Sequence, residues 1–328
     1  MSVYGAFTIL ADESDQGRRL DAVVAARLPD CSRSLAVNLI ANLEILVDNQ
    51  AKKPGYRVKC GDKILGRIPV PVQVEYEPEP IPLQILYQDS HMVVLNKQAG
   101  LVVHPAPGHS RGTLVNALLY HCPDLEGIGG EIRPGIVHRL DKDTSGTMAV
   151  AKNVGAHKSL ARQFKDRSVR KKYLALVYGE LQSDEGSLKL PIGRHPVHRK
   201  RMSTTTSKGR CAETSWRVRK RLEGITLLEL TLKTGRTHQI RVHCTAMGHS
   251  IVGDQVYRSR KWLKEPVGLF SGASSIAARL KAVPRQMLHA WRLGLTHPHT
   301  GEFMTFESPI PEDMAELMEK LEGRRHGA

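Results

Sequence analysis

The sequence predicts an α+β protein, in which a small α/β domain precedes a larger domain with a mixed, largely antiparallel sheet. Segments typical of strands dominate after residue 83, and they do not alternate regularly with helices as they do in a parallel α/β fold. A proline-rich stretch, PVPVQVEYEPEPIP, separates them from two short helical patterns nearer the start of the chain. We therefore predict an N-terminal tail (1–16), a small domain (17–75) and a large domain (76–328).

The small domain should contain two helices followed by short strands. Leu20, Val23, Val24 and Leu28 recur at helical spacing in the first helix. Ser32 can cap the second helix, which covers SRSLAVNLIANL. The segments EILVDNQ and YRVKCGDKILGRI are typical of short strands around turns.

The large domain should open with two strands in ILYQDSHMVVLNKQAGLVVHP and a helix in TLVNALLYHC. Two further strands, GIVHRL and TMAVAKN, flank a turn, and a basic amphipathic helix follows in GAHKSLARQFKDRSV. Later strands are expected in KKYLALVYGEL, GITLLELTLKTG and GEFMTFESPIP. Later helices are expected in EDMAELMEKLEG and in THQIRVHCTAMG, which Thr237 could cap. Residues 259–286 resemble an irregular insertion.

The positive charge of the chain is concentrated in one stretch. The formal net charge is +15, and residues 152–221 hold 19 Lys and Arg against five Asp and Glu, a net charge of +14. A solvated basic face would account for this excess. A concentration of this size is more typical of a surface that binds a polyanion, usually nucleic acid.

Composition disfavours several other classes of protein. The sequence has no run of 18 or more apolar residues, which a membrane span would need. The first residues also lack the pattern of an export signal. The five cysteines are far apart and form no C-x-x-C pair, which argues against a disulfide framework and for a reducing cytoplasm. None of the 15 histidines has the spacing of a metal site, so we expect no catalytic metal.

The segment HRLDKDTSG carries two carboxylates, Asp141 and Asp143, at the predicted turn. The pair is similar to a phosphotransfer motif, but Ser145 stands where that motif has Thr or Val, and no later Asp-Asp pair completes a magnesium site. Two interpretations remain. One is a lone carboxylate nucleophile that attacks an anomeric carbon and is kept ionised by a nearby guanidinium. The other is a plain β-turn, and the residues alone leave both open.

The same segment resembles the signature of the RluA/RluD family of RNA pseudouridine synthases. Gln98 and Arg258 depart from the proline and glycine that are usual at these places in the family. The further segments that resemble family motifs are VVLNKQAGLVVHP, RKKYLALVYG, TGRTHQIRVHCTAMGHSIVGDQVY and LHAWRLGLTHPHTGEFMTFESPIPEDM.

The small domain resembles an S4 domain, which is an RNA-binding module. The sequence departs from the family pattern at Asp48-Asn49-Gln50, where the family usually has V-N-G. The matching residues are Arg19-Leu20-Asp21, Ser32-Arg33-Ser34-Leu35-Ala36, Lys53-Pro54 and Gly61-Asp62.

The resemblance implies an enzyme that isomerises uridine in RNA to pseudouridine, without cofactor or metal. It implies that Asp141 is the nucleophile on a flipped-out uridine, that Arg241 pairs with Asp141, and that Tyr173 stacks on the uracil and helps to remove the C5 proton. It assigns Asp143 to the turn. The expected RNA contacts are Arg139, which would fill the place of the flipped nucleotide, and Lys171, Lys172, Arg236, His238 and Arg33.

An S4 domain ahead of this core is most similar to the large-subunit ribosomal RNA pseudouridine synthase D branch of the family. The implied partner is therefore large-subunit ribosomal RNA in the cytoplasm, with no membrane and no small-molecule cofactor. Two alternatives stay open: a pseudouridine synthase that acts on transfer RNA or on other ribosomal sites, and a non-catalytic S4-type assembly factor that binds ribosomal RNA.

Overall fold

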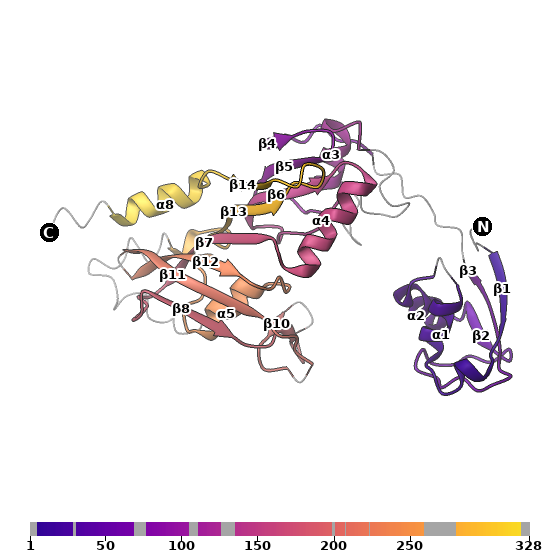
Figure 1. Ribbon diagram of the computed structural model, residues 1–328. Helices are drawn as coiled ribbons and strands as arrows, with labels where there is room; N and C mark the ends of the chain where they lie inside the picture. Colours follow the sequence, from indigo (N-terminus) through magenta and orange to yellow (C-terminus); the bar gives the residue numbers. More distant parts are fainter. Residues whose placement is uncertain are drawn as a thin grey trace. The chain divides into compact units, whose positions relative to one another are not determined.

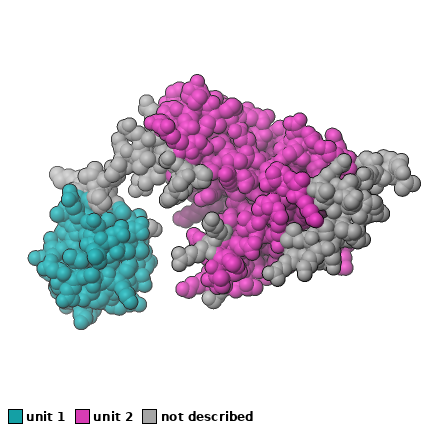
Figure 2. All heavy atoms as spheres, turned by 180° about the vertical axis from the view of Figure 1, so that it is seen from behind, with its two compact units in different colours: residues 1–73 teal, residues 74–328 magenta. Residues whose placement is uncertain are grey.

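The computed structural model divides the chain into two compact units, residues 1–73 and 74–328 (Figure 2). The domain boundary that we predict near residue 75 lies outside the described residues, as does most of the insertion predicted at 259–286. The residues that the structure describes are 5–28, 31–68, 77–104, 111–125, 135–198, 201–206, 208–222, 224–258 and 280–322.

The first unit is a three-stranded antiparallel sheet with two helices. Its strands follow the order β1-β3-β2. Residues 5–10, which the sequence placed in a tail, form β1 instead and pair with β3 along their whole length. Phe7 and Ile9 are buried in the core of this unit, and two apolar residues are too few to be recognised as a periodic pattern. The elements are β1 (Gly5–Leu10), a 3-10 turn (Glu13–Asp15), α1 (Leu20–Arg27), α2 (Arg33–Ala41), β2 (Ile45–Val47) and β3 (Lys63–Ile68).

The departure from the S4 pattern at Asp48-Asn49 lies in a tight turn. Both residues have positive φ, 49° and 57°, and Val47 and Gln50 exchange backbone hydrogen bonds across them. Asp and Asn tolerate this left-handed conformation better than other non-glycine residues. The turn is therefore closed by two residues that tolerate positive φ.

The second unit is built on a nine-stranded mixed sheet (Figure 1). The strand order is β4-β5-β6-β13-β7-β12-β11-β8, and β14 pairs with the C-terminal half of β13. Among the described strands of this sheet only the β6–β13 pairing is parallel, so the prediction of a mixed, largely antiparallel sheet is confirmed. The strands are β4 (Gln84–Gln88), β5 (Met92–Lys97), β6 (Ser145–Ala151), β7 (Arg170–Tyr178), β8 (Glu185–Lys189), β11 (Glu213–Leu222), β12 (Ile225–Leu232), β13 (Leu288–Thr296) and β14 (Phe303–Glu307), with a separate small pair, β9 (Gly193–Arg194) and β10 (Met202–Ser203).

Helices cover both faces of this sheet. On the β5–β6 half, α3 (Leu114–His121) packs against Met148 and Val150, while α4 (Val154–Asp166) packs against Ala149 and Ala151. Successive strand residues point to opposite faces, so the two helices lie on opposite sides. On the β7–β12 half, α5 (Gln239–Ala246) and α8 (Glu312–Glu322) are separated in the same way.

Two parts of the sheet differ from the sequence-based prediction. The segment GIVHRL makes a single bridge, Ile136 to Val150, instead of a strand. The strands β8, β11 and β13 were not predicted as separate elements. β11 alternates charged and apolar residues only weakly, and β13 is buried on both faces, so neither has a clear period of two.

Candidate active site

The segment that leads to Asp141 lies against the C-terminal half of β6. Gly135 has φ +64°, and a Cβ there would lie 2.0 Å from the carbonyl oxygen of Ala151, so only glycine fits. The ring of His138 takes the place of a strand carbonyl, because its Nε2 accepts the N–H of Ala149 at 3.0 Å. Burial lowers the pKa of His138 to about 3, so the ring stays neutral and can accept this bond. The segment 135–140 is thus an extended anchor for Asp141.

The residues after Asp141 join β6 to β13. Gly146 has φ +119°, and a Cβ there would lie 2.3 Å from the carbonyl oxygen of Ala290. The hydroxyl of Ser145 lies 3.0 Å from Nδ1 of the buried His289. Ser145 and Gly146 are therefore structural, because they allow the close approach of the two parallel strands β6 and β13.

A buried lysine holds the backbone of this loop by hydrogen bonds. Lys97 is fully buried, and its Nζ donates to the carbonyl oxygens of Gln98, Leu101 and Lys142 at 2.7–2.9 Å. Burial lowers the pKa of Lys97 to about 7, although the carboxylates of Asp143 and Asp141 act in the opposite direction. Because Lys142 follows Asp141 directly, this contact fixes the backbone of the turn.

Arg241 from α5 connects Asp141 to a second carboxylate. Its NH1 donates to Asp141 Oδ2 at 3.0 Å, and its Nε and NH2 donate to Asp254 at 2.7 and 3.0 Å. Burial alone would raise the pKa of Asp254, but the bonds from Arg241 and from the N–H groups of Tyr257 and Val256 lower it. Burial would likewise lower the pKa of Arg241, and the two carboxylates raise it above its usual range. The guanidinium is therefore held in one orientation by Asp254 and offers its remaining edge to Asp141.

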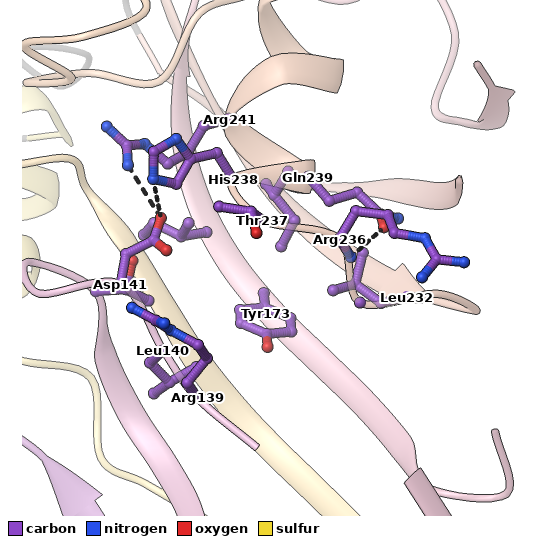
Figure 3. Close-up of a pocket in the computed structure, with 14 residues that line it drawn as sticks. Arg139, Leu140, Asp141, Tyr173, Leu232, Arg236, Thr237, His238, Gln239 and Arg241 are labelled. Atoms are coloured by element: carbon purple, nitrogen blue, oxygen red, sulfur yellow. Dashed lines mark hydrogen bonds and ion pairs between the residues drawn. The ribbon is translucent and has the colours of Figure 1, made fainter. Parts of the chain in front are cut away.

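Asp141 and Arg241 line a pocket of about 150 Å³ (Figure 3). Tyr173 of β7 lies in the middle of the view, with Asp141 and Arg139 on one side and Leu232 on the other. Burial and the carboxylate of Asp141 raise the pKa of Tyr173 well above its usual range, so it remains a neutral phenol. The structure thus brings together Asp141, Tyr173 and Arg241, which the sequence places far apart.

The loop before α5 forms a further part of the pocket wall. Gln239 is buried and accepts from Thr234 Oγ1 at 2.8 Å and from the N–H of Arg236 at 3.0 Å. His238 has φ +55° and precedes the helix in the capping position, so the predicted cap at Thr237 is wrong. Nε2 of His238 lies 3.8 Å from Asp141 Oδ2. Arg236 and His238, both predicted to contact RNA, therefore lie at the pocket.

The other predicted RNA contacts do not all lie at the pocket. Arg139 is exposed and lines the pocket. Lys171 lies partly buried 6.0 Å from the ring of Phe164. Lys172 points to the sheet face opposite Tyr173 and pairs with Glu229 at 2.8 Å. Arg33 belongs to the first unit, where it lies 3.3 Å from Asp21. RNA contacts at these positions stay predictions.

Several residues of the site were not singled out from the sequence. Asp254, Tyr257 and Lys97 all stand within segments that resemble family motifs, which was the available signal. Among the described residues, no group of three or more His, Cys, Asp and Glu side chains is arranged so that it could hold a metal ion. No described helix is long and apolar enough to cross a membrane.

The comparisons with known proteins agree with this site. Residues 91–246 match the family model of RNA pseudouridylate synthases, and residues 18–64 match the S4 domain. The chain therefore belongs to the RNA pseudouridine synthase family and is an RNA pseudouridine synthase that carries an S4 domain. This confirms the resemblance seen in the sequence.

Its relatives include close matches over nearly the whole length. The chain is 43% identical over 319 residues to the uncharacterized RNA pseudouridine synthase YlyB of Bacillus subtilis, covering 97% of this chain and 98% of that protein. It is 44% identical to the ribosomal large subunit pseudouridine synthase D of Nitrosomonas europaea, covering 95% and 87%. The solved structure of human RNA pseudouridylate synthase domain containing 1 is 28% identical with a TM-score of 0.53, covering 77% of this chain and 97% of that one.

Proposed function

We propose that this chain converts uridines of large-subunit ribosomal RNA to pseudouridine, with Asp141 as the nucleophile on a flipped-out uridine. The observation that carries the proposal is the carboxylate of Asp141, held by Arg241 in a pocket that also contains Tyr173. The ribosomal substrate is supported by the relatives named ribosomal large subunit pseudouridine synthase D and by the S4 domain. With ribosomal RNA as its substrate, the enzyme is expected to act in the cytoplasm.

The size of the pocket favours a flipped nucleotide. A pocket of about 150 Å³ is far larger than the space that one water molecule needs, so it has room for a base taken out of its helix. A paired uridine cannot reach Asp141, which is 23% exposed, without leaving its helix. Arg139, exposed at the pocket, is well placed to occupy the gap that the uridine leaves.

The chemistry requires a carboxylate with one oxygen held and one available. Among the described residues, the contacts of Asp141 with Arg241 and His238 both end on Oδ2, so Oδ1 is the oxygen that reacts. In the overall reaction the N1–C1′ bond breaks, C5 bonds to C1′, and the C5 proton is replaced by a proton on N1. Atoms and electrons balance without a redox partner. Tyr173, as a neutral phenol, stacks on the uracil and supports the transfer of the C5 proton.

The test compares two neighbouring aspartates. We expect Asp141→Asn to abolish tritium release from large-subunit ribosomal RNA labelled at uridine C5, because the amide cannot act as a nucleophile. Binding of the same RNA should survive. Asp143→Asn, which changes the other carboxylate of the turn, should retain most activity. Full activity in Asp141→Asn would overturn the assignment of the nucleophile.

The substrate is tested separately. Pseudouridines should disappear from large-subunit ribosomal RNA in a strain that lacks this chain, and they should return when the wild-type chain is supplied. Loss confined to transfer RNA would instead support that alternative substrate. An unchanged pattern in both RNAs would favour a non-catalytic assembly factor.

A further inference from the structure

The ring of His238 contacts a tyrosine hydroxyl through Nδ1, the nitrogen that does not face Asp141. Its Nδ1 lies 2.8 Å from the hydroxyl oxygen of Tyr257, whose side chain is only 7% exposed. The same hydroxyl oxygen accepts the N–H of Met202 at 2.8 Å. Burial raises the pKa of Tyr257, so the hydroxyl keeps its proton. These contacts come from three separate segments of the chain and meet directly behind the pocket.

The contacts select one tautomer of the ring. The Met202 N–H already donates to the phenol oxygen, and Nδ1 is the acceptor that the described residues offer to the phenol proton. Nδ1 therefore accepts, and the ring hydrogen of neutral His238 resides on Nε2. Nε2 is the nitrogen that faces Asp141, at 3.8 Å from Oδ2 (Figure 3). This distance is too long for a hydrogen bond, so the N–H is available to a ligand.

The surroundings of His238 keep the ring neutral. Burial is the largest effect and lowers the pKa of His238. Arg241 and Arg139 act in the same direction, whereas the carboxylates of Asp141 and Asp254 oppose it. A neutral donor beside a carboxylate suits an uncharged oxygen, since a phosphate would be repelled by Asp141.

We propose that Tyr257 holds His238 as the Nε2–H tautomer, and that this N–H donates to an uncharged hydroxyl or carbonyl oxygen of the uridine bound at Asp141. His238 is then a catalytic residue, and Tyr257 is a positioning residue that acts through it. The inference rests on the proposed function, because it needs a uridine in this pocket. It adds a hydrogen-bond donor at the reacting centre that is distinct from Arg241.

The first test removes one oxygen atom. Tyr257→Phe keeps the ring that lies 5.1 Å from the Arg241 guanidinium but loses the hydroxyl. We expect kcat to fall on the order of tenfold with KM nearly unchanged. The neutral ring loses a hydrogen bond that favours it, so the pKa of His238 rises and the acid limb of the pH–rate profile moves to higher pH.

The second test replaces the ring. His238→Gln keeps an N–H donor near the position of Nε2 and should retain much of the activity, without the acid limb due to His238. His238→Leu has no donor and should lose about 100-fold in kcat. In the His238→Gln background, Tyr257→Phe should cost less than about twofold, because its effect acts through the imidazole.

The control is Tyr87→Phe, which removes the hydroxyl that donates to Asp89 at 3.0 Å away from the pocket. It should leave kcat and the pH profile unchanged. The proposal is overturned if Tyr257→Phe has a wild-type rate and profile, or if it lowers kcat equally in the wild type and in His238→Gln. Should Tyr257→Phe fail to fold, equal rates in His238→Gln and His238→Leu would still overturn it. Inactivity of Asp141→Asn tests the proposed function independently of these outcomes.

Discussion

Arg241 is the residue on which the geometry of the site depends. It is 5% exposed and shared between two carboxylates, one buried completely and one open to the pocket. A buried guanidinium needs a fixed anionic partner, because removing either member of such a pair leaves an uncompensated charge. Asp254 meets this need with both oxygens, which leaves NH1 to orient Asp141.

We expect Asp254→Asn to lower both activity and stability. The amide can accept from Arg241 at only one atom, so the guanidinium loses its fixed orientation and its charge balance. The rate of pseudouridine formation should fall by about 10- to 100-fold, and the free energy of unfolding by about 3 kcal/mol. Single-turnover tritium release and urea unfolding measure these two effects.

The matched control removes a charge from an exposed pair. In Arg292–Glu307 the side chains are 40% and 48% exposed, so Glu307→Gln should change stability by less than about 1 kcal/mol. Its rate should equal that of the wild type. A wild-type rate in Asp254→Asn would contradict the positioning role of that residue.

At the scale of the elements, the site depends on the seam between β6 and β13. Parallel pairing there extends only over Ser145 and Gly146, opposite His289 and Ala290. The seam sets where Asp141 leaves the sheet, and Tyr173 reaches the same place from β7, on the other side of β13. A small shift of β6 against β13 would therefore move Asp141 relative to the ring of Tyr173.

We expect Gly146→Ala to open this seam. A Cβ would lie 2.3 Å from the carbonyl oxygen of Ala290, and φ +119° is unfavourable for alanine. The free energy of unfolding should fall by more than about 2 kcal/mol, and tritium release should slow markedly. Urea unfolding and the release assay are the two measurements.

The control variant Gly301→Ala introduces a residue with unfavourable positive φ but no steric clash. Gly301 has φ +76°, but a Cβ there would meet nothing within 4 Å. Its cost should be about 1 kcal/mol, with no change in rate. Equal losses in the two variants would show that the approach of β6 to β13 is not the important feature.

At the scale of the whole molecule, the positive charge is less uniform than the sequence indicates. On β11, Arg217, Lys220 and Arg221 each form an ion pair, at 3.2, 2.6 and 2.7 Å. On α4, by contrast, Lys158 and its neighbours Arg162 and Lys165 are exposed, and the described residues provide no acidic partner for them. The charge of α4 is therefore available to RNA, whereas these three charges of β11 are paired, although both elements lie in the same basic stretch of sequence.

We expect the triple change Lys158→Gln/Arg162→Gln/Lys165→Gln to weaken RNA binding and flatten its salt dependence. If each residue contacts one phosphate, the slope of log K against log salt should decrease by about 2 to 3. Filter binding of a large-subunit ribosomal RNA fragment at several salt concentrations measures this slope. The triple change Arg217→Gln/Lys220→Gln/Arg221→Gln should alter it less, and equal effects would contradict the assignment.

The sequence was sufficient for the class of fold and the class of enzyme. The motif around Asp141, with its companions around Tyr173 and Arg241, identified the family, because these strings depend on residue order and not on packing. The residues alone left a nucleophile and a plain turn as alternatives. Local periodicity also predicted most helices, but it did not separate β8, β11 and β13 or place a strand at residues 5–10.

The arrangement of partners required the folded chain. Asp141 and Arg241 form their ion pair although they are 100 residues apart in the sequence. Lys172 lies on the sheet face opposite Tyr173 and pairs with Glu229. Basic residues of β11 form ion pairs, as Arg221 does with Asp184, whereas those named on α4 have no acidic partner among the described residues. The tautomer of His238 likewise depends on Tyr257 and Met202, which lie on separate segments. Hydrogen bonds and ion pairs act over about 3 Å, so they are determined by which distant segments come into contact, and a linear sequence does not contain that information in its local pattern.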